Sequence, residues 1–385
     1  MIRFQAPELP GTQAVAAYFA RAEDARWYSN RGPCHELLVE RLEGLLGGVK
    51  CVPVANATLG LMLGLRALVG PGRPGRREVL LPSFTFAATV NAVLWAGLQP
   101  VFVDVEERSW HLDPVALERA LDARGRSVSA VLACSTFGVP PPLSNRRRWE
   151  EAARAADVSL LVDSAAGFGA TGEDGEILGA QGDAEVFSFH ATKPFAIGEG
   201  GLITTANEQL ANRLTQLANF GFEDGVVHTD VGLNAKLSEW SAATALAVLD
   251  TYDEVLARRR AAANLMLDQL EEQGYQRQSG STEPAWQFVP VLAPSGAVRA
   301  AALEVTRRAE IEIRTYFAVP LHRMPAFAGV PIEGDLRCTE DLAERALSLP
   351  MANDLASSHV NAIVASLGAA IAAASPAGAG RLALD

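Results

Sequence analysis

Strand-like and helix-like patterns alternate along this chain from about residue 36 to about residue 250. Short apolar runs, which fit buried strands, are each followed by a longer segment whose apolar residues recur at helical spacing. The expected strands are 51–55, 78–82, 100–104, 129–133, 159–163 and 184–189, and the expected helices are 36–46, 58–68, 87–96, 114–121 and 149–156. Runs that are apolar throughout fit strands covered on both faces, so the alternation predicts an α/β fold with a mainly parallel sheet flanked by helices.

The pattern changes after Ser238. Residues 239–270 contain no Gly or Pro and predict a long helix, broken at most once, that leads into a smaller domain. There the expected elements are a strand at 287–292, a helix at 297–309, a strand at 312–315 and a final helix at about 357–374. The chain is therefore expected to form a large domain at 1–250 and a small C-terminal α/β domain at 251–385, with a disordered tail from about 376 because the end is rich in Ala, Gly and Pro.

Composition and charge argue against several classes of protein. The chain is 49% hydrophobic and 20% charged, which is typical of an ordinary soluble globular protein. Its formal net charge of -12 argues against binding to nucleic acid or to an anionic membrane. We expect no membrane-spanning run and no secretory signal, and hence a cytoplasmic location. The four cysteines and six histidines are scattered without metal-ligand spacing, so no metal site is expected.

The stretch 186–205 carries the strongest chemical signal. Lys193 lies between an apolar strand-like run and Gly198-Glu-Gly-Gly201. A lysine amine can form a covalent bond with a carbonyl, and pyridoxal phosphate is held in this way with an acidic residue against its pyridine nitrogen. Asp163, at the end of an apolar strand, is the candidate for that acid. A surface lysine and a turn-forming aspartate are the ordinary interpretations of each residue alone, but the pair in this order predicts a cofactor site.

Three further segments could complete such a site. Asn56-Ala-Thr58 precedes an apolar helix, where free backbone N–H groups and the helix dipole favour a phosphate. Ser188 could add a hydroxyl, and Phe86 could stack on a flat ring. Each also has a purely structural interpretation, as a helix cap, an ordinary strand serine and a core aromatic residue.

Taken in order, these segments resemble the sugar aminotransferases of the DegT/StrS group, which are fold type I pyridoxal phosphate enzymes. The resemblance extends over nearly the whole chain, and Ser188-Phe-His-Ala-Thr-Lys193 with Gly198-Glu-Gly-Gly201 is its most specific part. The other matching segments are 29–33, 56–58, 84–89, 100–104, Asp163, 232–234, 237–239, 320–322 and 349–351. The resemblance implies a large domain with a mainly parallel mixed sheet, followed by a smaller C-terminal α/β domain.

The resemblance also implies roles for single residues. Lys193 would hold the cofactor through a Schiff base and act as the general base, and Asp163 would bond the pyridine N–H. The remaining cofactor contacts would be made by Ala57, Thr58 and Ser188 to the phosphate and by Phe86 to the ring.

Assembly and substrate binding are implied in the same way. Asn234 would reach the phosphate in the neighbouring subunit, because members of the family form homodimers with shared active sites. Tyr316 and His322 would contact the substrate.

The activity implied is transfer of an amino group from glutamate or glutamine to a keto group on a nucleotide-linked keto-deoxysugar. Two alternatives remain open. One is an enzyme acting on a keto-cyclitol or another non-nucleotide carbonyl, or a lyase that does not transaminate; the other is a binding or regulatory protein without turnover. Ala166 and Lys236 keep the first alternative open, because the family usually has Gln or His at the former position and Arg at the latter. Phe220 and Ser135 also stand where the family usually has His.

Overall fold

The computed structural model describes residues 1–70, 72, 75–227, 232–280 and 283–374. Within these residues, seven strands form one large sheet in the order β1-β7-β6-β5-β4-β2-β3. They are β1 (Lys50–Val54), β2 (Glu78–Pro82), β3 (Gln99–Val103), β4 (Val128–Cys134), β5 (Ser159–Asp163), β6 (Ala184–Ser188) and β7 (Gly201–Thr205). Neighbouring strands from β3 to β6 run parallel, and β7 is antiparallel to both β6 and β1. The predicted α/β fold with a mainly parallel sheet is confirmed.

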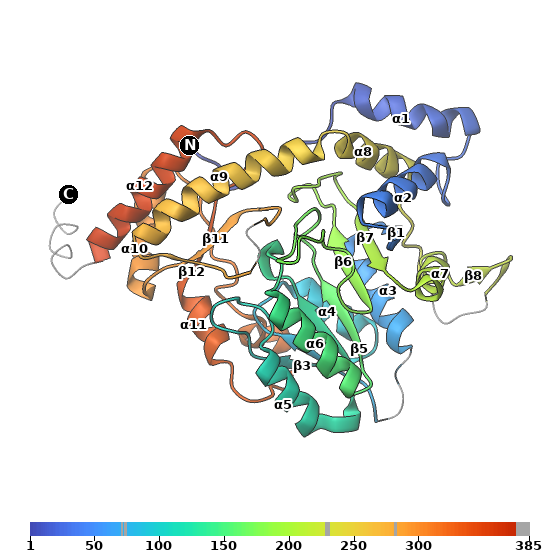
Figure 1. Ribbon diagram of the computed structural model, residues 1–385, viewed down its shortest axis with the longest axis horizontal. Helices are drawn as coiled ribbons and strands as arrows, with labels where there is room; N and C mark the ends of the chain where they lie inside the picture. Colours follow the sequence, from blue (N-terminus) through green and yellow to red (C-terminus); the bar gives the residue numbers. More distant parts are fainter. Residues whose placement is uncertain (71, 73–74, 228–231, 281–282, 375–385) are drawn as a thin grey trace.

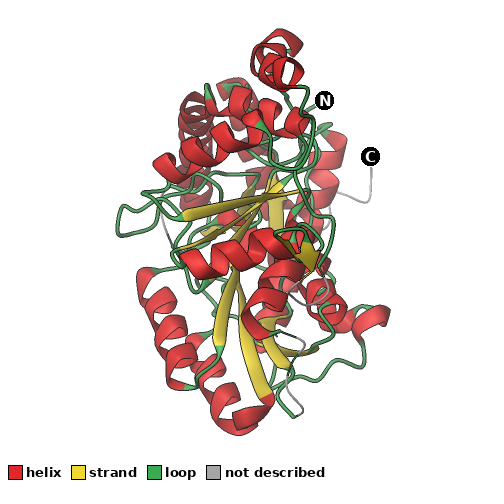
Figure 2. Cartoon of the chain, turned by 90° about the vertical axis from the view of Figure 1, so that its right-hand side faces the viewer, coloured by secondary structure: helices red, strands yellow, loops and turns green. Residues whose placement is uncertain are grey.

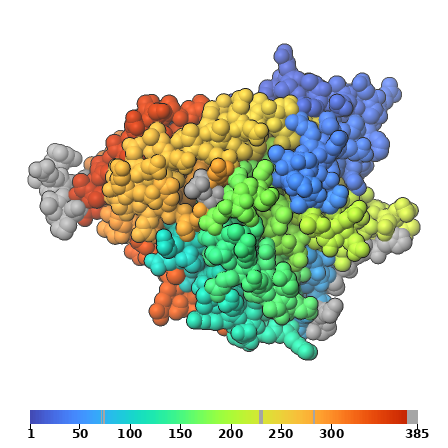
Figure 3. Space-filling model, in the orientation of Figure 1, coloured from blue at the N-terminus to red at the C-terminus, as the bar shows by residue number. Residues whose placement is uncertain are grey.

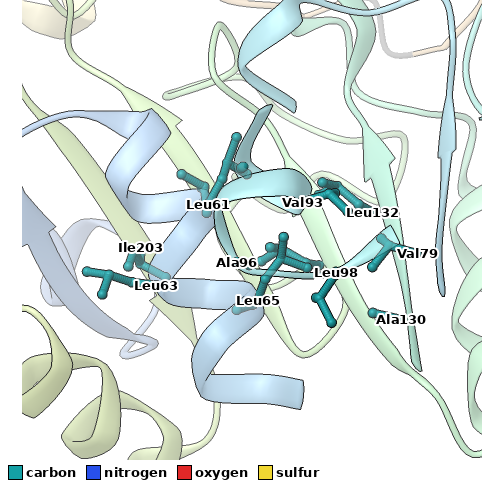
Figure 4. Packing of buried hydrophobic residues seen from close by; sticks show 14 of the residues in the cluster. Leu61, Leu63, Leu65, Val79, Val93, Ala96, Leu98, Ala130, Leu132 and Ile203 are labelled. Carbon is teal, nitrogen blue, oxygen red and sulfur yellow. The ribbon is translucent and has the colours of Figure 1, made fainter. Parts of the chain in front are cut away.

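Helices cover both faces of this sheet (Figure 2). One face packs against α3 (Ala57–Val69), α4 (Ala87–Trp95) and α7 (Glu208–Leu217), and the other packs against α5 (Pro114–Arg124) and α6 (Leu143–Ala155). Figure 4 shows the first layer, where Leu61 and Leu65 of α3 lie beside Val93 of α4. Successive strand residues serve opposite faces, because Leu80 joins the second layer while Leu81 joins the first. Apolar residues on both faces explain why these strands were recognisable as continuous apolar runs.

The C-terminal part is built around a smaller sheet. Among the described residues it has the antiparallel order β10-β11-β12, with β10 (Gln276–Arg277), β11 (Val289–Leu292) and β12 (Ala346–Leu349). The helices of this part are α9 (Tyr252–Glu272), α10 (Gly296–Arg308), α11 (Arg337–Arg345) and α12 (Ser357–Ala374). The helix α8 (Glu239–Leu249) precedes α9, so the predicted long helix is broken once, at Asp250 and Thr251.

The remaining elements are short or lie near the N-terminus. They are α1 (Thr12–Ala25), α2 (Pro33–Leu45), the hairpin of β8 (Phe222–Glu223) and β9 (Val226–Val227), and the 3-10 turns η1 (Gly125–Ser127), η2 (Thr136–Gly138), η3 (Leu321–Arg323) and η4 (Pro325–Phe327). The long helix α9 begins against the large-sheet part of the chain, where the Tyr252 hydroxyl donates to the Phe168 carbonyl at 2.6 Å. Figure 3 shows the gold surface of the region around α9 next to the green surface of the large-sheet part. The two parts of the chain therefore share a packed boundary.

The first residues of the chain pair with its C-terminal part (Figure 1). Ile2 forms a bridge with Ile311, and the backbone N–H of Phe4 donates to the Glu312 carboxylate at 3.1 Å. The Gln5 side chain then donates to the carbonyl of Thr192 at 3.5 Å. The N-terminal segment thus joins residues 311–312 of the C-terminal part to the loop that carries Lys193.

Two sequence predictions are corrected here. The strand predicted at 312–315 is wrong, since this segment forms only isolated bridges through Ile311 and Arg314. The helix predicted at 149–156 begins earlier, at Leu143, with Pro142 at the N-cap position. Its first turns contain Asn145 and three arginines, which lack the apolar spacing that marks a helix in the sequence. The predicted disordered tail lies outside the described residues, and the division at residue 250 stays a prediction.

The helix α12 is unusually apolar. Among the described residues, α12 is the one helix that is long and apolar enough to cross a membrane by length and composition, with a mean hydropathy of 1.4. The expectation that no run reaches that length is therefore wrong. In the fold, Val360, Ile363 and Leu367 are buried in the hydrophobic cluster of the C-terminal part. Burial of one face explains why this helix is so apolar.

Candidate active site

Asp163 lies at the carboxyl end of β5, where parallel strands expose their last residues at one edge of the sheet. It pairs in register with Cys134 of β4 and Val186 of β6. Its Oδ2 accepts a hydrogen bond from the Thr89 hydroxyl at 2.8 Å, and its Oδ1 accepts one from the backbone N–H of Ala165 at 3.2 Å. Burial raises the pKa of Asp163, while these two donors and the charge of Lys193 act in the opposite direction.

Lys193 lies in the loop between β6 and β7. Its Nζ donates to Oε1 of Gln287 at 2.9 Å. Burial lowers the pKa of Lys193 to about 8, although the negative charge of Asp163 raises it. An amine with such a pKa is partly neutral near neutral pH, which is the form that attacks a carbonyl. The structure therefore brings Lys193 and Asp163 into one electrostatically coupled site.

The predicted phosphate turn is built by close packing of two backbones. The Asn56 side chain caps α3 by accepting from the N–H of Leu59 at 2.9 Å. Gly201 of β7 lies against this turn, and a Cβ at that position would stand 2.7 Å from the nitrogen of Ala57. Gly201 also pairs in register with Ser188. The strand β7 thus lies between the turn and Ser188, and glycine is required there by the close approach.

Phe86 and Phe84 have different surroundings although they are two residues apart. Phe84 is fully buried in an aromatic cluster, whereas the Phe86 side chain is 63% exposed at the N-cap position of α4. One turn along α4 is Thr89, whose hydroxyl contacts Asp163. The exposed ring is therefore free to stack on a flat ligand beside Asp163.

Asn234 is exposed and forms an antiparallel bridge with Asn219. Two residues on, Lys236 donates to the Asn219 side chain at 2.8 Å, and its Nζ lies 4.7 Å from the centre of the Phe220 ring. Burial lowers the pKa of Lys236. Two of the departures from the family pattern, Lys236 and Phe220, therefore contact each other.

Tyr316 and His322 have contrasting surroundings. Tyr316 is 37% exposed and touches Phe4, Phe288 and Phe317. His322 is held on both ring nitrogens, with Nδ1 at 2.8 Å from the Ser83 hydroxyl and Nε2 at 2.6 Å from the Glu340 carboxylate. Tyr316 is the more open of the two to a ligand, while His322 links β2 to the C-terminal part.

Beneath the Asp163 turn lies a buried polar network that sequence reasoning missed. The hydroxyls of Ser135 and Ser164 are 2.8 Å apart, and Ser164 also donates to Oε1 of Glu185. Gln181 donates to the same carboxylate through its backbone and its side chain. Burial raises the pKa of Glu185 to about 7. This network fixes the backbone that follows Asp163 and includes Ser135, another departure from the family pattern.

Three functional candidates were missed because each looks ordinary in the sequence. Thr89 belongs to a recognised segment but had no assigned role, and Glu185 lies inside an apolar strand. Gln287 precedes β11 of the C-terminal part, about ninety residues from Lys193. The one available signal was Glu185, since a charged residue inside an apolar run needs a buried partner. Ala166 has only a methyl group, so its side chain supplies no hydrogen bond to a ligand.

Comparisons with known proteins match nearly the whole chain. The model of the DegT/DnrJ/EryC1/StrS aminotransferase family matches residues 11–368. Protein Rv3402c of Mycobacterium tuberculosis is 35% identical over 374 residues, which is 95% of this chain and 89% of that protein. A UDP-N-acetyl-3-dehydro-alpha-D-glucosamine 3-aminotransferase of Acidithiobacillus ferrooxidans is 33% identical over 335 residues, 85% of each chain. A crystal structure from Bacillus cereus ATCC 10987, described as a PLP-dependent aminotransferase, superposes with a TM-score of 0.89 at 30% identity, covering 95% of this chain and 99% of that one.

Proposed function

This chain belongs to the DegT/DnrJ/EryC1/StrS aminotransferase family and is a PLP-dependent aminotransferase of the sugar aminotransferase type, and from that premise we propose a reaction for it. It moves an amino group from glutamate or glutamine to the keto group of a nucleotide-linked keto-deoxysugar. The observation that carries the proposal is the pairing of a Lys193 amine of lowered pKa with the Asp163 carboxylate that acts on it. A lysine that can form a Schiff base and an acid for the pyridine nitrogen are the two groups that a pyridoxal phosphate enzyme requires.

The residues present fit pyridoxal phosphate. Ala57, Thr58 and Ser188 would hold its phosphate beside Gly201, where backbone packing leaves space only for glycine. Phe86 would stack on its ring. When bound, this cofactor withdraws electrons from the substrate carbon next to the transferred nitrogen.

The remaining chemistry belongs to the side chains. Asp163 would hold a proton on the ring nitrogen, with its orientation fixed by Thr89 and by the N–H of Ala165. Lys193 Nζ would hold the cofactor before reaction, and afterwards take the proton from the substrate carbon and return it. An amine with a pKa of about 8 is suited to both tasks near neutral pH.

A nucleotide-linked keto sugar is supported by the Acidithiobacillus relative, whose name specifies a UDP-linked 3-dehydro sugar. A second candidate substrate, a keto-cyclitol or another non-nucleotide carbonyl compound, is favoured by Lys236 and Phe220. Lys236 is engaged with Asn219 and the Phe220 ring, and a lysine cannot replace the bidentate grip of arginine on a carboxylate or phosphate.

We also propose a homodimer with shared active sites. Asn234 is exposed, as a residue that serves a neighbouring site must be, and Trp27 and Trp240 lie half exposed near α1 and α8. A two-fold interface would give two identical shared sites. The cytoplasmic location stays a prediction.

The first experiment tests cofactor and reaction together. Purified protein loaded with pyridoxal phosphate is treated with borohydride, and the modified peptide is identified by mass spectrometry. We expect modification of Lys193 in the native protein and none at that position in Lys193→Ala. Glutamate should then change the absorbance of the bound cofactor, and an unchanged spectrum with every amino donor tried would argue for a binding protein.

The second experiment identifies the substrate class. The amino-loaded enzyme is offered UDP-, dTDP- and GDP-linked keto sugars and, in parallel, keto-cyclitols. Amination of a nucleotide-linked sugar supports the proposal. Amination of keto-cyclitols alone would transfer the assignment to the second candidate.

A further inference from the structure

We propose that Gln287 is a positioning residue for the Lys193 amine, and that Thr192 and His190 hold Gln287 in the required orientation. The proposal rests on the proposed function, because it concerns the amine that would carry the reaction. Gln287 lies just before β11 in the C-terminal part, whereas Lys193 lies in the loop after β6. The contact therefore joins the two parts of the chain at the reactive nitrogen.

The chemistry of the side chains fixes the direction of this contact. A protonated lysine amine can only donate, so the group 2.9 Å from it must be the amide oxygen of Gln287. The amide nitrogen then points the opposite way, and it lies 3.4 Å from the Thr192 hydroxyl. Gln287 is 9% exposed, so water has little access to take the place of either partner.

His190 adds one more hydrogen bond in the same donor-to-acceptor direction. Its Nδ1 accepts the backbone N–H of Thr192 at 3.2 Å, which means that Nδ1 carries no proton. The Thr192 hydroxyl, 2.8 Å from Nδ1, must therefore donate to it, and its lone pairs are left to accept from Gln287. The result is a chain of hydrogen bonds that all run from Lys193 to His190. His190 then carries its proton on Nε2, which faces Glu199 at 3.7 Å.

This series of hydrogen bonds has a chemical consequence at Lys193. An acceptor that takes one N–H of the amine fixes rotation about the last bond of the side chain, so the remaining positions on nitrogen keep a set direction. An oxygen acceptor also stabilises the charged amine more than the neutral one. The ionisable groups that act on Lys193 from the large sheet are Asp163 and Cys134, and Arg259 and Glu8 line a small cavity together with it.

The test measures Lys193 in the cofactor-free protein. The rate of acetylation of Lys193 is followed by peptide mass spectrometry over a pH series that spans its pKa of about 8. Gln287→Leu, which removes the acceptor, should lower that pKa. Gln287→Glu, which keeps the oxygen and adds a negative charge, should raise it by about one unit or more. Thr192→Val should shift it in the same direction as Gln287→Leu, but by less.

Gln278→Leu is the matched control. Gln278 is also buried, and its amide donates to the carbonyls of Ser109 and Thr136, but it makes no contact with Lys193 among the described residues. This variant should leave the titration of Lys193 unchanged. In the loaded enzyme, Gln287→Leu should lower kcat/KM about tenfold or more, with partial recovery in Gln287→Glu.

Two results would overturn the proposal. One is that the pKa of Lys193 in folded Gln287→Leu equals that of the native protein. If Gln287→Leu does not fold, an unchanged pKa of Lys193 in Thr192→Val has the same meaning. The other is an equal shift in Gln278→Leu, which would indicate only a general loosening of the boundary. Because acetylation needs neither cofactor nor keto sugar, a failure here is distinct from a failure of the proposed reaction.

Discussion

The carboxylate of Glu239 lies at the N-terminus of α2, where its Oε2 accepts the backbone N–H of Cys34 at 2.6 Å. The other oxygen accepts the N–H of Gly32 at 2.9 Å, and His35 donates to the same carboxylate. Gly32 has no side chain with which to cap α2 itself, and a Cβ there would meet Glu239 at 2.9 Å. Glu239 also lies in the first turn of α8, so one buried charge serves the N-termini of two helices.

Removal of this carboxylate should destabilise the fold strongly. Glu239→Ala leaves several buried N–H groups without an acceptor, and each costs about 1–3 kcal/mol. We expect a loss of about 3 kcal/mol or more in the free energy of unfolding, measured by denaturant titration of the cofactor-free protein. Glu254→Ala, at a position that is 74% exposed, is the control and should change stability by less than about 0.5 kcal/mol. Equal losses in the two variants would refute the capping role.

Substitution of Asp163 should remove activity without unfolding the protein. Asp163→Asn keeps the shape but loses the charge that would hold a proton on the ring nitrogen. We expect kcat/KM to fall far more than tenfold, which corresponds to well over about 1.4 kcal/mol of barrier. Thr89→Val should give a smaller loss, because the hydroxyl that donates to Asp163 is missing but the carboxylate remains. If Asp163→Asn keeps more than about a tenth of the native rate, Asp163 has another role.

Glu185 should make the stability of the protein depend on pH. Its pKa is raised by burial from 4.5 to about 7, so the folded state binds a proton more tightly than the unfolded chain does. The contribution of protonated Glu185 to the free energy of unfolding is therefore complete below about pH 4.5. It is lost as the pH rises to about 7, and the free energy of unfolding falls by about 3 kcal/mol over this range. Glu185→Gln cannot titrate and should lack this decline. The check is denaturant unfolding of both proteins over that pH range, with Glu254→Gln as the exposed control; parallel curves for Glu185→Gln and the native protein would contradict it.

Shared active sites can be tested by mixing two damaged proteins. Lys193→Ala chains lack the reactive amine, and Asn234→Ala chains lack the residue proposed to serve the partner. If sites are shared, a mixed dimer has one site with both lesions and one site with neither, so activity should partly return after subunit exchange. If subunit exchange is verified and activity still does not return, the sites are not shared. Turnover by a monomer would rule out sharing as well.

The sequence predicted structure best where a single requirement, such as burial on both faces of a strand, determines the residue types. Strands buried on both faces, such as β4 and β5, appear as continuous apolar runs, and their ends locate Asp163. Lys193 could be recognised because an amine in a turn of this kind indicates a chemical role, and Gly201 because it belongs to the Gly198-Glu-Gly-Gly201 segment; the backbone contact that requires glycine there appears only in the structure. The short strand β12 was missed, because its four residues follow α11 directly and no turn residue separates them.

Contacts between distant segments could not be predicted in the same way. Gln287 carries no charge and no periodic signal, and its importance arises only because the fold brings it to Lys193. Glu239 resembles an ordinary helix-starting glutamate, although its carboxylate caps a helix some two hundred residues away in the chain. Such roles depend on tertiary approach, which neither propensity nor spacing encodes.

The pairing of Ile2 with Ile311 has a consequence for synthesis on the ribosome. Phe4 emerges 308 residues before its partner Glu312, and Met351, whose N–H donates to the Phe4 carbonyl, emerges later still. At about 5–20 residues per second, the N-terminal segment must wait on the order of tens of seconds without its partners. Gln5, which contacts the loop of Lys193, waits with it. A nascent chain that already carries Lys193 and Asp163 therefore still lacks a closed active-site loop, and cofactor capture should come only after the last strand has been released.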